Sequence, residues 1–182
     1  EVASNRASAL MLAQLVAANQ GRIVGEAEQL LRVAADSTGF PASNSDACNT
    51  QLRSLLEKSP DFEALAVSDS TGQIVCSART SVNAGPIDWQ LVGNRELERG
   101  ISNRTFVIAG VFSNTQSTAQ TLVFGLPEQS ATLRAGYVFL AGINTSTIAH
   151  ELAQAALPNE GAIMIVDALG NAVALDPNSN AD

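Results

Sequence analysis

The segment LAVSDSTGQIVCSA, residues 65–78, has the pattern of a β-hairpin. Apolar residues stand before and after a polar stretch that contains Asp69 and Gly72. An aspartate side chain can bond to the backbone two residues ahead, and glycine accepts a positive φ, which are the two properties that a tight turn requires. We therefore predict two antiparallel strands joined by a turn at residues 69–72, and we assign Asp69 to turn formation rather than to metal binding.

The same pattern occurs a second time near the end of the chain. The segment IMIVDALGNAVALD, residues 163–176, aligns without gaps on residues 65–78, and Asp167 and Gly170 take the positions of Asp69 and Gly72. The offset, the difference between 167 and 69, is 98 residues. A recurring hairpin indicates two related modules in tandem, of which the second is only begun in this chain.

Helical patterns precede the first hairpin. Residues 4–36 contain no proline and carry apolar residues at helical spacing, which predicts one long N-terminal helix over residues 1–36. A polar loop follows, and Ser45 or Asp46 is suited to cap a second helix that ends near Glu57. Cys48 falls on the same side of this second helix as Leu52, so we expect its thiol to point inward.

The region after the hairpin predicts an α+β fold. A short helix is expected around residues 89–99, strands at 105–112, 121–126 and 136–143, and a helix at 144–157 with Thr145 or Ser146 as its cap. The expected organisation is therefore a long helix (1–36), a first module (37–144), and a connecting helix with the first hairpin of a second module (145–182).

The composition excludes some classes of function. The chain has 182 residues, 46% of them apolar, and a net charge of −8. Its ten basic residues are scattered, whereas binding to nucleic acid requires clustered Lys and Arg, so we expect no nucleic-acid partner. No uncharged apolar run reaches about 18 residues, and there is no signal-peptide pattern. We therefore expect that the chain is a fragment of a longer protein and that any membrane anchor lies outside it.

No motif for catalysis or metal binding is found. A nucleophile elbow, a phosphate-binding loop, zinc spacings and a paired-carboxylate motif are all missing from the sequence, so we predict no catalytic residue, no metal and no cofactor. An enzyme remains an alternative that a turnover screen would reveal. The two cysteines, Cys48 and Cys76, are compatible with one disulfide or with two buried thiols, and zinc would need two further ligands.

Several blocks of sequence together resemble a known family. They are C-x3-L-x2-LL at residues 48–56, P-x-F-x-x-L-x-V-x-D at 60–69, G-x-I-V-C-S-A at 72–78 and LP-x-x-GA-x-x-x-V-D-x-x-G at 157–170. In this order they resemble the extracytoplasmic Cache (PAS-like) sensor domain, of the double-Cache type, of bacterial diguanylate cyclases, histidine kinases and chemoreceptors. A weaker resemblance is to the periplasmic CSS-motif redox sensor of cyclic-di-GMP phosphodiesterases, of which residues 76–78 are an imperfect copy.

The resemblance implies a fold and a function. It implies a membrane-distal module with a five-stranded antiparallel sheet flanked by helices, followed by a membrane-proximal module. It further implies a periplasmic domain of an inner-membrane protein, tethered by segments outside this chain. Such a domain is not itself an enzyme; it binds a small molecule and passes its state to a cytoplasmic output, such as a GGDEF cyclase, a phosphodiesterase, a kinase or a chemoreceptor region. A structural spacer without a ligand is the other alternative.

The resemblance also implies where a ligand binds. Family ligands lie between the sheet and the segment after the first hairpin, here residues 81–98. Asp88 and Trp89 would come from that segment, and the sheet would contribute Phe106, Ile108, Phe124 and Tyr137 or Phe139, depending on register. Many family members carry an arginine in this segment that grips a ligand carboxylate. Here residues 87–91 read IDWQL, so Arg79, Arg95 or Arg104 would have to replace it.

Two further expectations depend on the resemblance. Disulfides persist in the periplasm, so we expect Cys48 and Cys76 to form a structural disulfide between the second helix and the hairpin. The long N-terminal helix exceeds what one small module can cover, so we expect a parallel homodimer through residues 4–36 when the protein is held in a membrane.

Overall fold

The computed structural model describes residues 2–37, 45–80, 87, 89, 93–113, 120–128, 136–154, 164–166 and 172–175. The chain forms two compact units, one of residues 27–144 and one that combines residues 1–26 with 145–182. The first unit contains the sheet, and the two units are described separately below.

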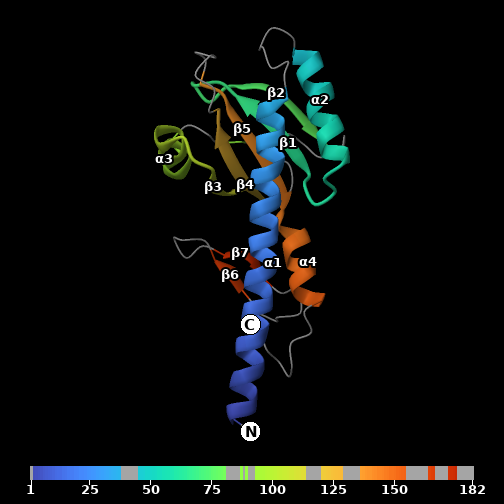
Figure 1. The fold of residues 1–182 in the computed structure, drawn as a ribbon, viewed down its shortest axis with the longest axis vertical. Coiled ribbons are helices and arrows are strands. Elements are labelled where there is room, and N and C mark those ends of the chain that lie inside the picture. The colour runs from blue at the N-terminus through green and yellow to red at the C-terminus, as the bar shows by residue number, and fades with distance from the viewer. Residues whose placement is uncertain are drawn as a thin grey trace. The chain divides into compact units, whose positions relative to one another are not determined.

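A five-stranded antiparallel sheet is the centre of residues 27–144 (Figure 1). Its strands lie in the order β2-β1-β5-β4-β3, so β1 and β5 are internal neighbours although 69 residues separate their ends. This confirms the predicted α+β fold. The strands are β1 (Ala64–Ser68), β2 (Ile74–Arg79), β3 (Val107–Ser113), β4 (Gln120–Pro127) and β5 (Val138–Asn144).

The turn between β1 and β2 forms as the sequence predicts. Asp69 Oδ1 accepts hydrogen bonds from the backbone N–H groups of Thr71 (2.8 Å) and Gln73 (3.0 Å) and from the Thr71 hydroxyl (2.6 Å). The hydroxyl bond, more than the backbone bonds, holds the pKa of Asp69 below its usual value. Gly72 has a φ of 84°, which a side chain would disfavour. Asp69 is therefore a turn residue.

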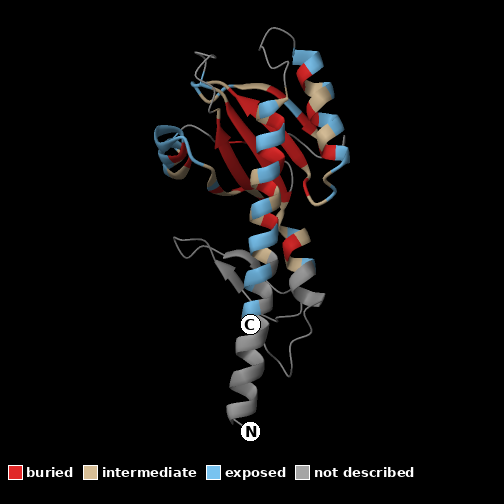
Figure 2. Cartoon of the chain, viewed as in Figure 1, coloured by how far each residue is buried: buried red, intermediate tan, exposed pale blue. Residues whose placement is uncertain are grey.

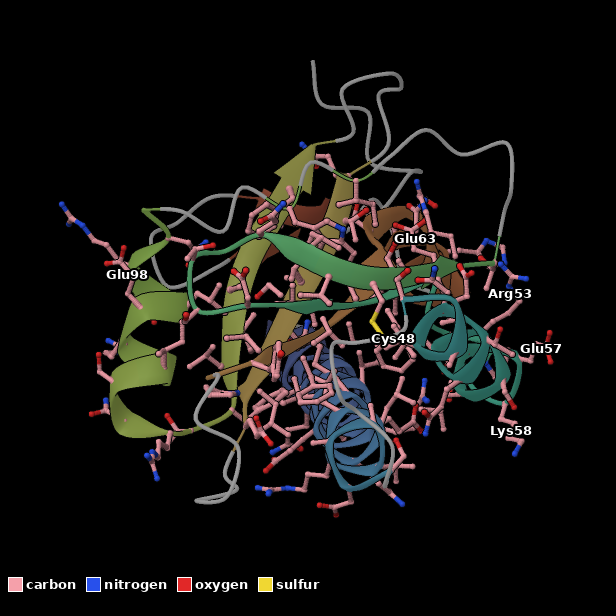
Figure 3. The ribbon with its side chains drawn as sticks, turned by 90° about the horizontal axis from the view of Figure 1, so that it is seen from above. Cys48, Arg53, Glu57, Lys58, Glu63 and Glu98 are labelled. Carbon is pink, nitrogen blue, oxygen red and sulfur yellow. A yellow bond between two sulfur atoms is a disulfide. The ribbon has the colours of Figure 1, made fainter. Side chains whose placement is uncertain are left out.

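Strand pairing divides the sheet into two faces, because residues directly opposite each other in an antiparallel pair point the same way. On what we call the helix-covered face, Val67 of β1 lies opposite Phe139 of β5 and Cys76 of β2. Helix α2 (Ser45–Glu57) and residues 27–36 of α1 (Val2–Asp36) lie on this side of the sheet (Figures 1 and 3). The central strands β1 and β5 are almost wholly buried (Figure 2).

Helix α2 is fixed to the edge strand β2 by two adjacent residues. Cys48 forms a disulfide with Cys76, with 6.0 Å between the two Cα atoms (Figure 3). Asn49 Oδ1 accepts a hydrogen bond of 2.8 Å from the backbone N–H of Ser77, a group on the free edge of the sheet. Leu52 and Leu56 of the same helix are buried. The helix thus covers both the apolar face and part of the exposed edge of β2.

The helix predicted at 89–99 was placed wrongly, because α3 spans Arg95–Asn103. Asn94 is the N-cap: its Oδ1 accepts from the backbone N–H of Leu97 at 2.9 Å, and its Nδ2 donates to the carbonyl of Ala109 in β3 at 2.8 Å. Gly93 has a φ of 80°, outside the helical region. These two residues set the start of α3 and leave Trp89 outside the helix.

The second unit contains a smaller hairpin that repeats the first one. Its strands are β6 (Met164–Val166) and β7 (Ala172–Leu175), and helix α4 (Thr145–Gln154) contacts β7. Ile165 pairs with Ala174 and Val166 with Ala172, with a register shift between the two pairs. At an offset of 98 residues the first hairpin shows the same pairs, Val67 with Cys76 and Ser68 with Ile74, and the same shift. The sequence repeat is therefore also a repeat of strand pairing.

Some predictions for this unit concern residues that the structure does not describe. Asp167 and Gly170, the predicted turn of the repeat, lie outside the described residues, and the second module remains a prediction. Helix α4 begins at Thr145, so the two predicted cap residues lie inside its first turn. Among the described residues, no helix is both long enough and apolar enough to cross a membrane.

The Cys48–Cys76 disulfide should contribute strongly to stability. It closes a loop over a sequence separation of 28 residues, which in the chain-entropy account stabilises the fold by about 3 to 4 kcal/mol, or about 10 °C in Tm. We expect the Cys76→Ser variant to melt lower than the parent by about that amount. Reductant should lower the Tm of the parent by a similar amount and leave the Cys48→Ala/Cys76→Ala variant unchanged.

The control is Ser77→Ala, a change at the exposed neighbouring position that keeps the backbone N–H bonded to Asn49. Its Tm should match that of the parent in calorimetry. Two alkylatable thiols in protein purified from the periplasm under denaturing, non-reducing conditions would contradict the structural role of the disulfide.

Candidate functional site

The second face of the sheet, which we call the tryptophan face, carries small side chains on β1 and at one position of β5, beside the larger Val138 and Leu140 of β5. It contains Ala64, Ala66 and Ser68 of β1 and Gly142 of β5, because Ala64 pairs with Gly142 and Ser68 with Val138. Helix α2 and residues 27–36 of α1 lie on the other side of the sheet (Figure 3). Small residues on adjacent internal strands leave room for a large group to approach the backbone closely.

Trp89 is the large group that lies over these small residues. Its side chain is 9% exposed and belongs to a buried cluster with Ala64, Ala66 and Leu140. A Cβ added to Gly142 would be 3.7 Å from Trp89 Cη2, so the ring reaches the backbone of β5. The ring therefore covers the strands β1 and β5 at the centre of the sheet.

Helix α3 covers the neighbouring part of the same face. A Cβ on Gly125 of β4 would come within 2.6 Å of Leu97 Cδ1, and one on Gly100 within 2.7 Å of a methyl group of Val107 in β3. The helix thus packs closely over β3 and β4, whereas Trp89 packs over β5. The tryptophan face has two covering groups that are joined by residues 90–94.

The strand register separates the residues that the sequence analysis grouped in one site. Phe124 is fully buried, but it lies on the helix-covered face, where it stacks on Phe106 with 6.0 Å between ring centroids and meets Phe62 edge-on at 6.4 Å. Ile108 pairs with Phe124 and is 45% exposed. These apolar residues lie across the sheet from Trp89, so the sequence-predicted group does not form a single site.

The remaining predicted site residues are placed as follows. Tyr137 is half-buried just before β5, and its carbonyl accepts a hydrogen bond from the Glu128 N–H at 2.8 Å. Phe139, the alternative to Tyr137, lies opposite Val67 on the helix-covered face. Asp88 lies outside the described residues. Of the sequence-predicted residues, Trp89 is therefore the one that the structure places on the tryptophan face.

A polar cluster adjoins Trp89, and it consists of Glu63, Arg79 and Thr121. The Thr121 hydroxyl donates a 2.5 Å hydrogen bond to Glu63 Oε1, and Arg79 Nη2 lies 3.8 Å from Glu63 Oε2. The side chains of Arg79 and Glu63 are 18% and 19% exposed, and Thr121 is buried. The cluster joins side chains from the ends of three strands at the border of the tryptophan face.

Backbone pairing positions this cluster. The Glu63 N–H donates to the carbonyl of Gly142 (2.9 Å), and the Glu63 carbonyl accepts from the Thr80 N–H (3.0 Å). Glu63 is therefore held between β5 and the end of β2. Thr121 pairs with Asn144 in β5, and its Cγ2 would lie 2.7 Å from a Cβ on Gly142. The backbone of Glu63 and the side chains of Thr121 and Trp89 thus meet at one glycine.

The three arginines that could replace the missing family arginine differ in position. Arg79 pairs with Ala64, which places it on the tryptophan face. Arg95 is exposed at the start of α3, and Arg104 is exposed at the C-cap of α3 with a φ of 53°. Of these three arginines, Arg79 is therefore the one that strand pairing places on the tryptophan face.

The sequence analysis did not identify Glu63 or Thr121. These residues are 58 positions apart, and neither lies in a recognisable motif. The only signal in the sequence is that a charged residue and a polar residue each stand at the start of an apolar strand. Such residues are common at strand ends, so the cluster becomes visible only through strand order and register.

The chemistry of this group of residues is suited to binding. It offers a carboxylate acceptor, a hydroxyl, a guanidinium donor and an aromatic ring within one region. Among the described parts of the chain, no group of three or more His, Cys, Asp or Glu side chains could hold a metal ion.

Comparison with known proteins gives structural matches only. No protein-family model matches the sequence, and no curated protein matches it. The amino-acid chemoreceptor PctC of Pseudomonas aeruginosa PAO1, whose ligand-binding domain was solved with GABA, is similar over 98% of this chain and 77% of its own, with a TM-score of 0.63 and 16% identity.

Two further structures have the same fold. The ligand-binding domain of the Campylobacter jejuni chemoreceptor Tlp3, solved with L-valine, matches 99% of this chain and 75% of its own, with a TM-score of 0.68 and 10% identity. The extracellular domain of the putative histidine kinase soHK1S-Z6 matches 87% of this chain and 65% of its own, with a TM-score of 0.61 and 12% identity.

These neighbours are the ligand-binding domains of two chemoreceptors and the extracellular domain of a putative histidine kinase. At these identities the likeness concerns the fold. The chain has the PAS-like fold of the ligand-binding extracellular domains of chemoreceptors and histidine kinases, as the resemblance in its sequence predicted.

Proposed function

We propose that this chain is the extracytoplasmic ligand-sensing domain of a bacterial transmembrane signalling protein. The observation that carries the proposal is the position of Trp89 over Ala64, Ala66 and Gly142, on the sheet face opposite α2 (Figure 3). An aromatic wall beside a few polar groups is the usual composition of a small-molecule site. The neighbours, which are ligand-binding domains of the same fold, support this reading.

The cysteine pair supports an extracytoplasmic location. Disulfides form and persist in the periplasm and outside the cell, and they are rare in the reducing cytoplasm. Cys48 and Cys76 form a disulfide that connects α2 with the sheet. We propose that the domain folds in the periplasm and is held at the inner membrane by segments outside this chain.

One residue of the site pairs with the residue at which the chain leaves the sheet, and this pairing suggests a route for a signal. Thr121 pairs with Asn144, the last residue of β5, and α4 begins at the next residue. A ligand that contacts Trp89 and the polar cluster would act on the strand that leads directly into α4. It can shift the equilibrium between two packings only as far as it binds them with different affinities. The proposed output is a cytoplasmic cyclase, phosphodiesterase, kinase or chemoreceptor region.

The first experiment is a screen of small molecules by thermal melting of the isolated domain. A ligand at 100 times its Kd should stabilise the fold by about 2.7 kcal/mol and raise the Tm by roughly 5 to 10 °C. Trp89→Ala should abolish this rise, and Trp89→Phe should retain part of it, because the ring is the proposed wall. A structural spacer would give no shift with any compound.

Trp89 could instead be needed only for folding. Titration calorimetry of the folded fraction separates the two roles, since it reports affinity per folded molecule. Unchanged affinity in Trp89→Ala, together with a collapse of its Tm, would assign the ring to the core and remove it from the site. Because Trp89 is the only tryptophan, its fluorescence should also change on ligand addition without interference from other indoles.

The proposed homodimer through α1 requires the intact membrane protein for its test. Single cysteines placed in turn along residues 4–36 should crosslink with a helical period if two copies of α1 run side by side, because one stripe of each helix then faces the other. The native cysteines do not interfere while they remain in their disulfide. Crosslinking that shows no period along the helix would exclude this dimer.

A further inference from the structure

We infer that the ligand of this domain is an amine that binds through its ammonium group to Glu63, with its carbon chain against Trp89. This inference rests on the proposed function, since it names the chemical class that the same site selects. It follows from how Glu63 is positioned, from how its two oxygens are occupied, and from the charges around it.

Thr121 and Gly142 connect the carboxylate of Glu63 with Trp89. The Glu63 N–H binds the carbonyl of Gly142 at 2.9 Å, and Trp89 Cη2 lies 3.7 Å from the point where a Gly142 Cβ would be. Thr121, which donates to Glu63 Oε1, has its methyl group 2.7 Å from the same point. The hydroxyl of Thr121 thus holds the carboxylate, while its methyl group lies on the side of Gly142 and Trp89, and the proposed ligand spans Thr121 to contact both.

The two oxygens of Glu63 differ in how well they are bonded. Oε1 accepts a short hydrogen bond of 2.5 Å from Thr121, which orients the carboxylate. Oε2 lies 3.8 Å from Arg79 Nη2, whereas a charge-assisted N–H···O bond is about 2.7 to 2.9 Å. An ionised carboxylate accepts about four hydrogen bonds. Oε2 thus retains acceptor capacity that an ammonium group, with its three donors, can use.

The charges around Glu63 disfavour a ligand carboxylate. Among the described residues, Arg79 is the arginine that strand pairing places on the tryptophan face, and Glu63 already compensates its charge. A carboxylate bound to Arg79 would lie next to the Glu63 carboxylate, and the two like charges would repel each other. Residues 80–94, which include the segment that carries Trp89, contain no Lys, Arg or His. This segment therefore offers no cationic side chain for an anionic ligand.

The remaining features favour a cation. Tryptophan is the aromatic side chain that attracts a cation most strongly when the cation lies over the face of the ring. The net charge of −8 raises the local concentration of cations around the domain, an effect that weakens as salt is added. A positively charged amine is thus attracted by the Glu63 carboxylate, by the Trp89 ring and by the negative net charge of the protein.

The experiment compares matched series of probes in titration calorimetry. Linear monoamines of two to six carbons are compared with the ω-amino acids and the carboxylates of the same lengths, alongside the hits of the melting screen. The best amine should bind at least about tenfold more tightly than the matched amino acid, and the carboxylate should not bind, because one lost charge-assisted contact or one added repulsion changes Kd by about 10- to 100-fold.

Variants of the polar cluster test the role of Glu63. Glu63→Gln keeps the side-chain shape and the acceptor for Thr121, and it should weaken amine binding about 10- to 100-fold. Arg79→Gln removes the competing cation and should strengthen amine binding. A purely structural cluster would not give this opposite pair of effects, since loss of either partner would then weaken binding. Glu57→Gln and Glu98→Gln, at exposed positions on α2 and α3, are the matched controls and should leave Kd unchanged (Figure 3).

The outcomes separate this inference from the proposed function. If a carboxylate or an uncharged compound is the tightest ligand, or if Glu63→Gln binds amines as the two control variants do, the inference is wrong while the domain remains a ligand sensor. If Glu63→Gln fails to fold, the sign of the Arg79→Gln effect decides the question. If no compound of the series or of the screen binds, both the inference and the proposed function are wrong.

Discussion

The antiparallel pairing of β1 with β2 on one side and β5 on the other is the constraint on which the rest of the structure depends. Side chains alternate between the two faces of a strand, so this one register decides which residues can meet. It turns Cys76 toward α2, where it forms the disulfide with Cys48, and it turns Ala64 and Arg79 toward Trp89. A shift by one residue would exchange both sets and separate the disulfide partners.

Both faces of the sheet carry buried apolar side chains, but they differ at the centre of the sheet. Phe124 and Phe139 fill the helix-covered face, whereas Val123, Val138 and Leu140 form a buried cluster with Trp89 on the other face. Alanine and glycine on the tryptophan face let the indole ring of Trp89 reach the backbone of β5. This arrangement combines a densely packed support with a face that large polar or aromatic groups can approach, which is what a rigid binding site requires.

The edges of the sheet are protected by polar side chains from the covering helices. Asn49 of α2 accepts from the Ser77 N–H on β2, and Asn94, the cap of α3, donates to the Ala109 carbonyl on β3. The strand β3 also carries a register shift between Ile108 and Gly110, which interrupts its pairing pattern. Each asparagine thereby positions a helix and occupies a backbone group that could otherwise pair with another chain.

The sequence by itself determined the local structure of this protein. Asp69 and Gly72 specify the first turn through their own backbone chemistry, and the repeat at an offset of 98 residues predicted a second hairpin with the same pairing. Such features depend on residues that are close in the sequence, so they can be predicted without knowledge of the tertiary structure. Only the tertiary structure decided the candidate site. Glu63 and Thr121 meet because β1, β5 and β4 are neighbouring strands. Phe124 is not part of the candidate site, because side chains alternate along β4 and that of Phe124 points to the helix-covered face. Which strands are neighbours, and in which register, is set by packing between distant segments, and a single strand sequence does not carry that information.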